Sequence, residues 1–289
     1  VVSWVNPDER HVDKTFESYM FEGIIAALDA VEAATGERQA SAIGYCIGGT
    51  LMAATLAWMA AKGDDRLKAV TFFTAQVDFT EAGDLQVFID EEQLRSLEEM
   101  MQKRGYLDGG EMSNTFSMLR DNDLIWSFVV NNYLMGKDPM PFDLLYWNSD
   151  STRMPQALHS YYLHRMYHEN RLVTPGAIVL GGVPIDLTRI KTPFYMQAGK
   201  EDHIAPYKSV FKGVNHFAGP TKFMLAGSGH IAGVINPPAA NKYNYWVNDK
   251  NPKTLEKWME GAVEHPGSWW PDWQAWISKK SGKKVPAKW

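Results

Sequence analysis

The segment around residue 45 constrains the fold more than any other part of the sequence. A short strand-like run, Ala40 to Gly44, passes through Gly-Tyr-Cys-Ile-Gly-Gly-Thr into the apolar run Leu51 to Ala61. This pattern predicts a strand, a tight turn and a helix packed on a sheet. Cys46, the only cysteine of the 289 residues, lies at the centre of that turn. A turn of this kind lifts a nucleophile above the sheet, and small flanking residues (Gly44, Gly48, Gly49) let the chain bend and pack closely.

The flanking sequence repeats the alternation of helix and strand. We expect a strand end at Val1 to Val5, a helix over Phe16 to Thr35 and a strand over Ala69 to Thr74. Further on, Thr192 to Ala198 and Lys222 to Ala226 (TKFMLA from Thr221) are strand candidates, each followed by a glycine-containing loop. Strands that alternate with helices predict a mostly parallel α/β sheet with flanking helices.

Residues 80–170 interrupt this alternation, because they contain helical and irregular patterns without convincing strand alternation. We interpret residues 1–79 and 171–289 as two parts of one α/β core, and 80–170 as a cap or lid insertion. The stretch Leu85 to Gly110 is the segment expected to move when substrate enters. The block holds eight of the fourteen methionines: Met100, Met101, Met112, Met118, Met135, Met140, Met154 and Met166.

Composition excludes several classes of function. The net charge of −5 argues against a nucleic-acid-binding protein, which usually carries a basic excess. No apolar run approaches the roughly 18 residues of a membrane helix, and no signal peptide is visible. A lone cysteine indicates a reducing compartment. The chain begins at Val1 without a methionine, so we expect a fragment of a longer protein. The aromatic run from Trp269 is expected to be a docked terminal helix.

Two polar residues follow the later strands, where a cysteine nucleophile would need its partners. The expected order along the chain is nucleophile, acid, histidine. Asp202 in GKEDHIAP and His230 in GSGHIAG satisfy it. The helix after Cys46 directs its positive end at the sulfur and favours the thiolate, and the Ile47 N–H is the candidate oxyanion donor.

Other polar residues compete for these roles. Asp78 and Asp186 are rival acids that fit less well, because Asp78 follows the strand next to the turn and Asp186 precedes a strand. His164 and His168 have a spacing that suits a metal, but the general-base glutamate and a third ligand are missing, so ordinary surface or core histidines are expected. His203 and Ala232 are candidates for contacts behind the acid and the histidine.

Seven motifs together resemble the catalytic domain of class I polyhydroxyalkanoate synthases: SWVNPD, GYCIGGT, NTFSMLRDNDLIWSFVVNNYL, PFDLLYWNSDSTRMP, EDHIAP, SGHIAGVINPPA and HPGSWWPDW. The resemblance covers essentially the whole chain and implies an α/β-hydrolase fold with Cys46 as nucleophile, His230 as base and Asp202 as its carboxylate partner. It implies polymerisation of (R)-3-hydroxyacyl-CoA into polyester with release of CoA. The family's N-terminal domain and early strands, with the loop that supplies the second oxyanion donor, are not in this sequence.

The resemblance also carries expectations about partners. CoA is part of the substrate and no separate cofactor or metal is expected. A homodimer with contacts in residues 80–170, a cytoplasmic location at the granule surface and granule-associated proteins are implied. Two other functions stay open: a cysteine-dependent thioesterase or esterase of the same fold, and a non-catalytic scaffold on the granule. The presence of all three triad candidates argues against the scaffold.

Overall fold

The computed structural model describes residues 1–119, 121–138, 150–283 and 286. The chain forms two compact units, which we call the sheet unit and the helical unit. The sheet unit comprises Glu17–Gly83 and Arg165–Trp289, and the helical unit comprises Val1–Phe16 and Asp84–His164. Within the described residues, no helix has the length and apolar character that crossing a membrane requires.

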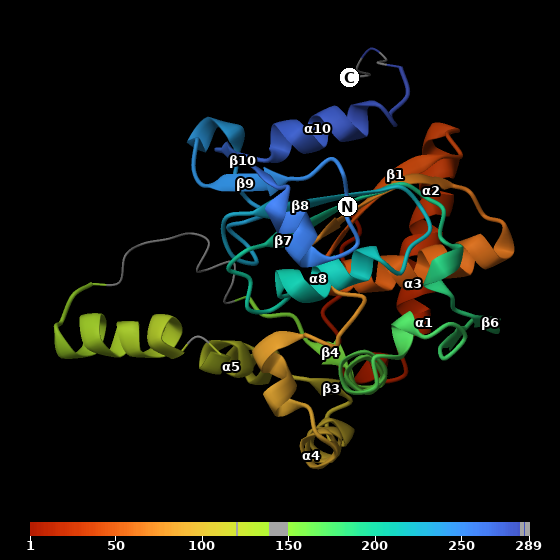
Figure 1. Cartoon of the computed structure of the whole chain (residues 1–289). Helices are drawn as coiled ribbons and strands as arrows, with labels where there is room; N and C mark the ends of the chain where they lie inside the picture. The colour runs from red at the N-terminus through yellow and green to blue at the C-terminus, as the bar shows by residue number, and fades with distance from the viewer. Residues whose placement is uncertain (120, 139–149, 284–285, 287–289) are drawn as a thin grey trace. The chain divides into compact units, whose positions relative to one another are not determined.

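The sheet unit is built on six strands in the order β1-β2-β7-β8-β9-β10 (Figure 1). The first four run parallel, whereas β9 and β10 are antiparallel to their neighbours. This is the mostly parallel sheet that the sequence predicts, although the two antiparallel strands were not anticipated. The strands are β1 (Ala40–Tyr45), β2 (Leu67–Phe73), β7 (Phe194–Gly199), β8 (Thr221–Ala226), β9 (Asn244–Val247) and β10 (Val263–Pro266).

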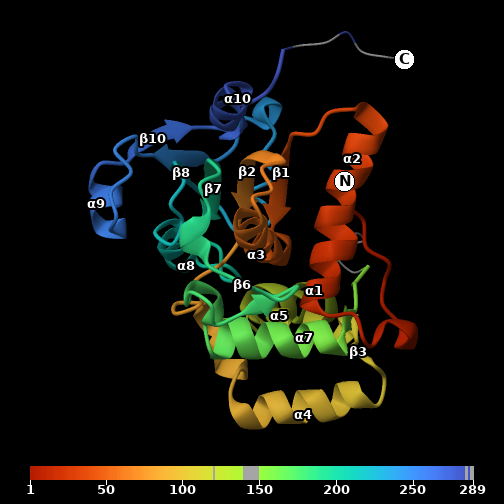
Figure 2. The ribbon, with the colours of Figure 1, turned by 90° about the vertical axis from the view of Figure 1, so that its right-hand side faces the viewer.

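Helices cover both faces of the sheet. Figure 2 shows α10 (Trp270–Ser278) on one face, and α3 (Ile47–Lys62) and α8 (Tyr207–Val214) on the other. Successive strand residues point to opposite faces. Phe72 therefore stacks on Phe217 on the α8 side, whereas Phe73 meets Trp269 edge to face on the α10 side.

The terminal helix α10 is docked on the sheet, as the sequence predicts. Trp269 is fully buried in a cluster with Phe73 and Tyr195. Polar contacts fix the helix as well, because Asp272 accepts a hydrogen bond from the Tyr195 hydroxyl at 2.9 Å and pairs with Lys222 at 2.7 Å. Burial and the Asp272 charge raise the pKa of the Tyr195 hydroxyl well above its usual range, so it remains a donor.

The predicted helix over Phe16 to Thr35 is continuous but not uniform. It runs as α1 (Phe16–Tyr19), the π-helical η2 (Met20–Ile25) and α2 (Ala26–Thr35). Gly36 ends it in the left-handed conformation, which glycine adopts without steric cost. The remaining elements of the sheet unit are η6 (Leu163–His168, which begins in the helical unit), η7 (Arg171–Val173), β5 (Val179–Leu180), β6 (Val183–Pro184), η8 (Leu187–Arg189), η9 (Pro238–Ala240) and α9 (Leu255–Glu260).

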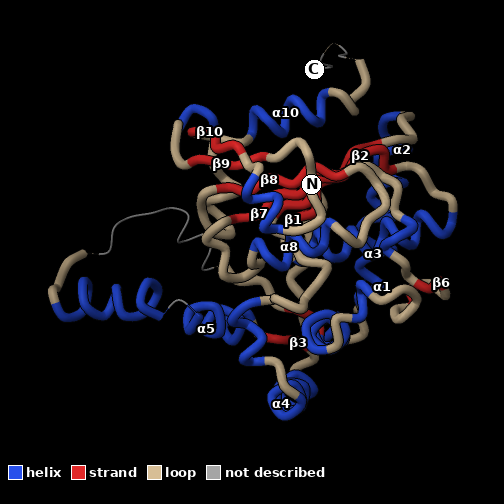
Figure 3. Tube along the Cα trace, in the orientation of Figure 1, coloured by secondary structure: helices blue, strands red, loops and turns tan. Residues whose placement is uncertain are grey.

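The helical unit is dominated by helices, as expected for this part of the chain (Figure 3). The helix α4 begins after the capping residue Asp90, whose side chain accepts from two backbone amides, and it buries Leu94 and Met101. The elements are η1 (Glu9–His11), η3 (Gly83–Phe88, which begins in the sheet unit), α4 (Glu91–Gln102), β3 (Tyr106–Leu107), α5 (Gly109–Leu119), η4 (Asn122–Trp126), η5 (Val129–Leu134), β4 (Met154–Pro155) and α7 (Gln156–Tyr162).

The opening residues Val1 to Val5 form no strand and are exposed, so the expected strand end there is wrong. The methionines of the helical unit divide between two environments, since Met101 is buried whereas Met118 and Met135 are more than half exposed. Met140 lies outside the described residues.

Candidate active site

Cys46 occupies a sharp turn between β1 and α3. Its φ of 52° and ψ of −127° lie in a region that non-glycine residues rarely adopt. The strained backbone is held in place, because the Cys46 N–H donates to the Phe73 carbonyl at 3.0 Å and the Cys46 carbonyl accepts from Gly49 at 2.8 Å. Such strain persists where the surrounding structure over-determines it, typically at functional sites.

The glycines of the turn do not contribute equally. A Cβ on Gly44 would lie 2.7 Å from the Gly49 Cα, and a Cβ on Gly49 would lie 2.3 Å from the Ala75 Cβ. Both positions therefore require glycine so that strand and helix can approach. Gly48 has open space around it, so the expectation that all three glycines serve close packing is wrong for this one.

Asp202 and His230 meet at the carboxyl ends of β7 and β8. The His230 Nδ1 lies 2.7 Å from the Asp202 Oδ2, and the Asp202 side chain is completely buried. The other carboxylate oxygen accepts hydrogen bonds from the backbone amides of Ile204 at 2.9 Å and Ala205 at 2.8 Å. The loop thus fixes the carboxylate and leaves one oxygen directed at the imidazole.

His230 also interacts with Cys46. Burial lowers the pKa of His230, but hydrogen bonds to Asp202 and Cys46 and the negative charges of both outweigh it and raise the pKa to about 10. The imidazole therefore carries a proton at neutral pH. The structure thus brings to one site the three residues that the sequence singled out: the His230 imidazole binds the Asp202 carboxylate, and its interaction with Cys46 helps to raise the His230 pKa.

Tyr45 is a part of this site that sequence reasoning missed. Its hydroxyl donates to the His230 carbonyl at 2.9 Å, and the tyrosine and imidazole ring centroids are 5.4 Å apart. Burial and the charges of Cys46 and Asp202 raise the pKa of Tyr45 above its usual range, so the hydroxyl stays protonated. Its place beside the nucleophile was visible in the sequence, but no pattern linked it to residue 230.

Thr74 is a second feature without a sequence signal. It follows β2 with a φ of 42°, which is unusual for a β-branched residue. The carbonyl and the side-chain oxygen of Gln197 both accept from its N–H, at 2.9 and 3.2 Å. This turn ends β2 at Phe73, whose carbonyl holds Cys46, so the strain lies next to the nucleophile.

The candidate oxyanion donor Ile47 is the first residue of α3. Backbone N–H groups of a first helical turn have no partner within the helix, so the group has the chemistry that the role requires. The role itself stays a prediction, as does the source of a second donor.

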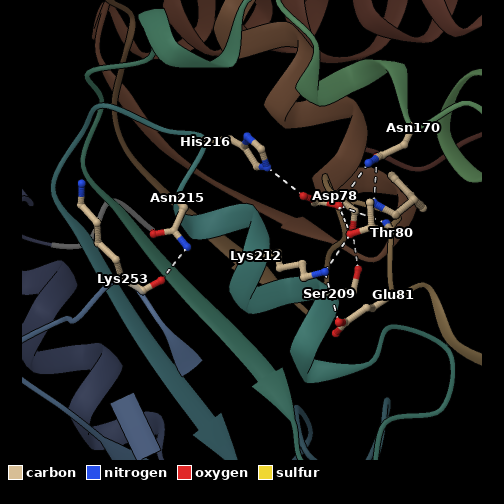
Figure 4. Close-up of polar contacts among 10 residues, drawn as sticks. Asp78, Thr80, Glu81, Asn170, Ser209, Lys212, Asn215, His216 and Lys253 are labelled. Carbon is tan, nitrogen blue, oxygen red and sulfur yellow. Dashed lines mark hydrogen bonds and ion pairs between the residues drawn. The ribbon is translucent and has the colours of Figure 1, made fainter. Parts of the chain in front are cut away.

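The rival acids have other partners. Asp78 pairs with His216, whose Nε2 lies 2.8 Å from its Oδ2 (Figure 4). Asp186 caps the short helix η8 by accepting from Thr188. Neither carboxylate contacts His230 in the described contacts of the chain, in agreement with their lower ranking from sequence. The pairing of Asp78 with His216 was not anticipated.

The remaining candidates are less informative. The His164 Nε2 lies 3.0 Å from the Glu98 Oε1, a polar contact of the kind found on ordinary helix surfaces. His203 and Ala232 are half-buried in the loops that carry the acid and the histidine. Their expected supporting roles stay predictions.

Comparison with known proteins adds to this geometry. The sequence pattern of the family described as alpha/beta hydrolase fold matches residues 5–237. The chain is 57% identical to the poly(3-hydroxyalkanoate) polymerase subunit PhaC of Rhizobium meliloti, covering 100% of this chain and 47% of that protein. It is 55% identical to the poly(3-hydroxyalkanoate) polymerase of Methylorubrum extorquens, with 100% and 48% covered.

A more distant relative gives the same picture. The polymerase subunit PhaC of Cupriavidus necator is 42% identical, with 99% of this chain and 50% of that protein covered. The chain thus spans about half the length of the curated relatives that it matches.

Proposed function

The chain belongs to the α/β-hydrolase fold family, and we propose that it is the catalytic part of a polymerase that converts (R)-3-hydroxyacyl-CoA into poly(3-hydroxyalkanoate). The observation that carries the proposal is the site formed by Cys46, His230 and Asp202 at the strained turn after β1. The names of the relatives support the choice of polymerisation over other acyl transfers.

The first half of the proposed cycle transfers the acyl group to the enzyme. In the proposed cycle Cys46 attacks as a thiolate beside the protonated imidazole of His230. The thiolate attacks the thioester carbonyl, and the oxyanion that forms is met by the Ile47 N–H. Collapse breaks the bond to the CoA sulfur, which takes the proton of His230 and leaves as free CoA. One thioester has then replaced another, so the acyl group stays activated.

The second half extends the polymer. Neutral His230 now accepts a proton from the hydroxyl of another hydroxyacyl unit, and that oxygen attacks the Cys46 thioester. The Cys46 thiolate is expelled and the pair of imidazolium and thiolate is restored. Asp202 holds the imidazole in orientation throughout, since its Oδ2 stays on the Nδ1 side of the ring. No cofactor enters this cycle, because CoA arrives with the substrate.

Partners and location belong to the same proposal. The C-terminal part of the segment that contains α5, η4 and η5 exposes large apolar side chains, and such a surface favours burial against another surface. We propose a homodimer with contacts in residues 80–170, a cap role for that block, and work at the surface of a polyester granule in the cytoplasm together with granule-associated proteins. The exposed side chains are Met118, Ile125, Trp126, Phe128, Val130, Tyr133, Leu134 and Met135.

One assay tests the polymerase against its nearest alternative. Purified protein that contains this chain is given (R)-3-hydroxybutyryl-CoA, and free CoA, free hydroxy acid and polymer are measured together. We expect CoA release matched by polymer. Release of CoA matched by free hydroxy acid would instead assign a thioesterase, and absence of release would leave the non-catalytic scaffold.

A further inference from the structure

Asp78 lies in a buried segment that leaves β2 and carries no catalytic group. Its side chain is only 10% exposed, and its neighbours Val77 and Phe79 are fully buried. Its Oδ1 accepts from the backbone amide of Thr80 at 3.0 Å, from the Thr80 hydroxyl at 2.7 Å and from the Asn170 side-chain amide at 3.2 Å. Its Oδ2 faces His216. A carboxylate with so many contacts fixes the segments that supply them.

Asn170 joins this cluster from a distant part of the sequence. It takes the left-handed conformation with φ of 48°, which asparagine tolerates better than most residues. Its side-chain oxygen accepts from the Phe79 amide at 2.8 Å while its side-chain nitrogen donates to Asp78. The sheet unit is interrupted after Gly83 and resumes at Arg165. Within that unit, Asp78 lies in residues 74–83, which we call the departing segment, and Asn170 lies in the segment that returns after Arg165. The hydrogen bonds between them link these two segments.

The helix α8 holds the same segment from its other side (Figure 4). The Ser209 hydroxyl donates to the Asp78 carbonyl. Lys212 donates to the Thr80 hydroxyl at 3.0 Å and pairs with Glu81 at 3.1 Å. Ser209 and Lys212 are three positions apart, which places them on one side of α8. His216 follows the C-terminal end of this helix.

These contacts lead directly to the catalytic acid. The loop Asp202 to Pro206 runs straight into α8, which begins at Tyr207. The departing segment touches this loop as well, because a Cβ on Gly83 would lie 2.7 Å from the Pro206 Cγ. The segment therefore packs against both the acid loop and the helix that continues it.

We infer that Asp78 is a positioning residue for Asp202: by fixing the departing segment to Asn170 and to His216, which follows α8, its side chain holds the acid loop in the geometry that directs the Asp202 carboxylate at His230. The inference rests on the proposed function for its kinetic consequences only. Its structural consequence, an ordered acid loop, is measurable without turnover.

The chain offers a matched control for Asp78. Asp186, Leu187 and Thr188 form the same local turn, in which the Asp186 Oδ1 accepts from the Thr188 amide at 2.9 Å and the Thr188 hydroxyl at 2.6 Å. Replacement of either aspartate removes the same local contacts. The contacts to Asn170 and His216 belong to Asp78, so the difference between the two variants reports on those long-range contacts.

The test compares Asp78→Ala with Asp186→Ala by hydrogen exchange and steady-state kinetics. The amides of Ile204 and Ala205 bind Asp202, so peptides over residues 202–206 report on the acid loop. We expect Asp78→Ala to accelerate exchange there by roughly tenfold or more and to lower kcat by about tenfold with KM changed less than about twofold. Asp186→Ala should do neither. Exchange accelerated only in residues 74–83, with kcat as in the parent protein, would overturn the inference.

Two milder variants keep the test decisive if Asp78→Ala does not fold. Asp78→Asn retains an oxygen for Thr80 and loses the charge, and His216→Gln retains a donor for Asp78. We expect amide hydrogen exchange at residues 202–206 to be slightly faster in His216→Gln than in the parent protein, and faster still in Asp78→Asn. Exchange at the parent rate in both variants would overturn the inference. If the parent protein releases no CoA, the proposed function fails, but the exchange data still decide whether Asp78 positions the acid loop.

Discussion

The hydroxyl of Tyr45 donates a 2.9 Å hydrogen bond to the carbonyl oxygen of His230, 185 residues further along the chain. Tyr45 immediately precedes Cys46, so one side chain links the backbone that carries the nucleophile to the backbone that carries the base. Asp202 fixes the imidazole from the Nδ1 side. Together the two contacts restrain both the ring and the main chain of His230.

Replacement of Tyr45 by phenylalanine removes this hydroxyl and keeps the ring. A neutral hydrogen bond of this kind contributes on the order of 1 kcal/mol to stability, so we expect the melting temperature to fall by about 2–4 °C. Because the main chain of His230 is then less restrained, we expect kcat to fall by roughly fivefold with KM changed little. Tyr243→Phe is the control, because that side chain is about half exposed. Equal kcat in the parent protein and Tyr45→Phe would show that the bond does not position His230.

The role of Cys46 is tested by Cys46→Ala and Cys46→Ser. Alanine removes little volume, so we expect a folded protein with no CoA release above the background rate. Serine should be severely impaired too, because its hydroxyl needs far stronger activation than a thiol and the acyl-enzyme becomes a less reactive ester. Circular dichroism and melting curves establish that both variants fold. Substantial CoA release by a folded Cys46→Ala protein would remove the residue from the mechanism.

The pair of His230 and Asp202 gives a pH dependence of stability with a definite sign. The pKa of His230 is raised from 6.5 to about 10 in the folded protein, so the folded state binds the proton more tightly than the unfolded state. The stabilisation is therefore complete below pH 6.5 and is lost as the pH rises through about 10.

Asp202→Asn provides the comparison, because it removes the largest of the contacts that raise this pKa. We expect the melting temperature of Asp202→Asn to lie below that of the parent protein by at least about 3 °C under pH 6.5. The difference should shrink as the pH approaches 10. A difference that stays constant from neutral to alkaline pH would contradict the assignment, and Asp186→Asn should show no such trend.

The sequence predicted those parts of the fold that depend on neighbouring residues. The predicted strand Lys222 to Ala226 lies within β8. It was predictable because a short apolar run bounded by proline and glycine favours a buried strand over a helix. The candidates Cys46, Asp202 and His230 were found for a related reason: each follows a recognisable strand, and carboxyl ends of neighbouring parallel strands meet at one edge of a sheet.

Contacts between distant residues could not be predicted in this way. Tyr45 and His230, like Asp78 and His216, are brought together by strand order, and no local pattern encodes which of several histidines faces a given side chain. The strands β9 and β10 carry mixed sequences, NYWV and VEHP, without the clear alternation of a half-buried strand. Antiparallel pairing at the end of the sheet stabilises them instead.

The last prediction concerns two adjacent glycines in the turn, which differ in their surroundings and therefore in their response to alanine. Gly49→Ala places a Cβ 2.3 Å from the Ala75 Cβ, so α3 must shift away from the segment after β2. Overpacking of this kind costs about 1–3 kcal/mol. Because Cys46 accepts from the Gly49 amide, the shift should also displace the nucleophile and lower kcat.

Gly48→Ala has room for the added methyl group and replaces glycine by a better helix former inside α3. We expect it to stabilise the protein by about 0.5–1 kcal/mol and to leave kcat near that of the parent protein. Urea unfolding of the two variants in parallel measures both effects. Similar destabilisation by both substitutions would show that the turn tolerates no side chain at either position, and would contradict the contact that distinguishes Gly49 from Gly48.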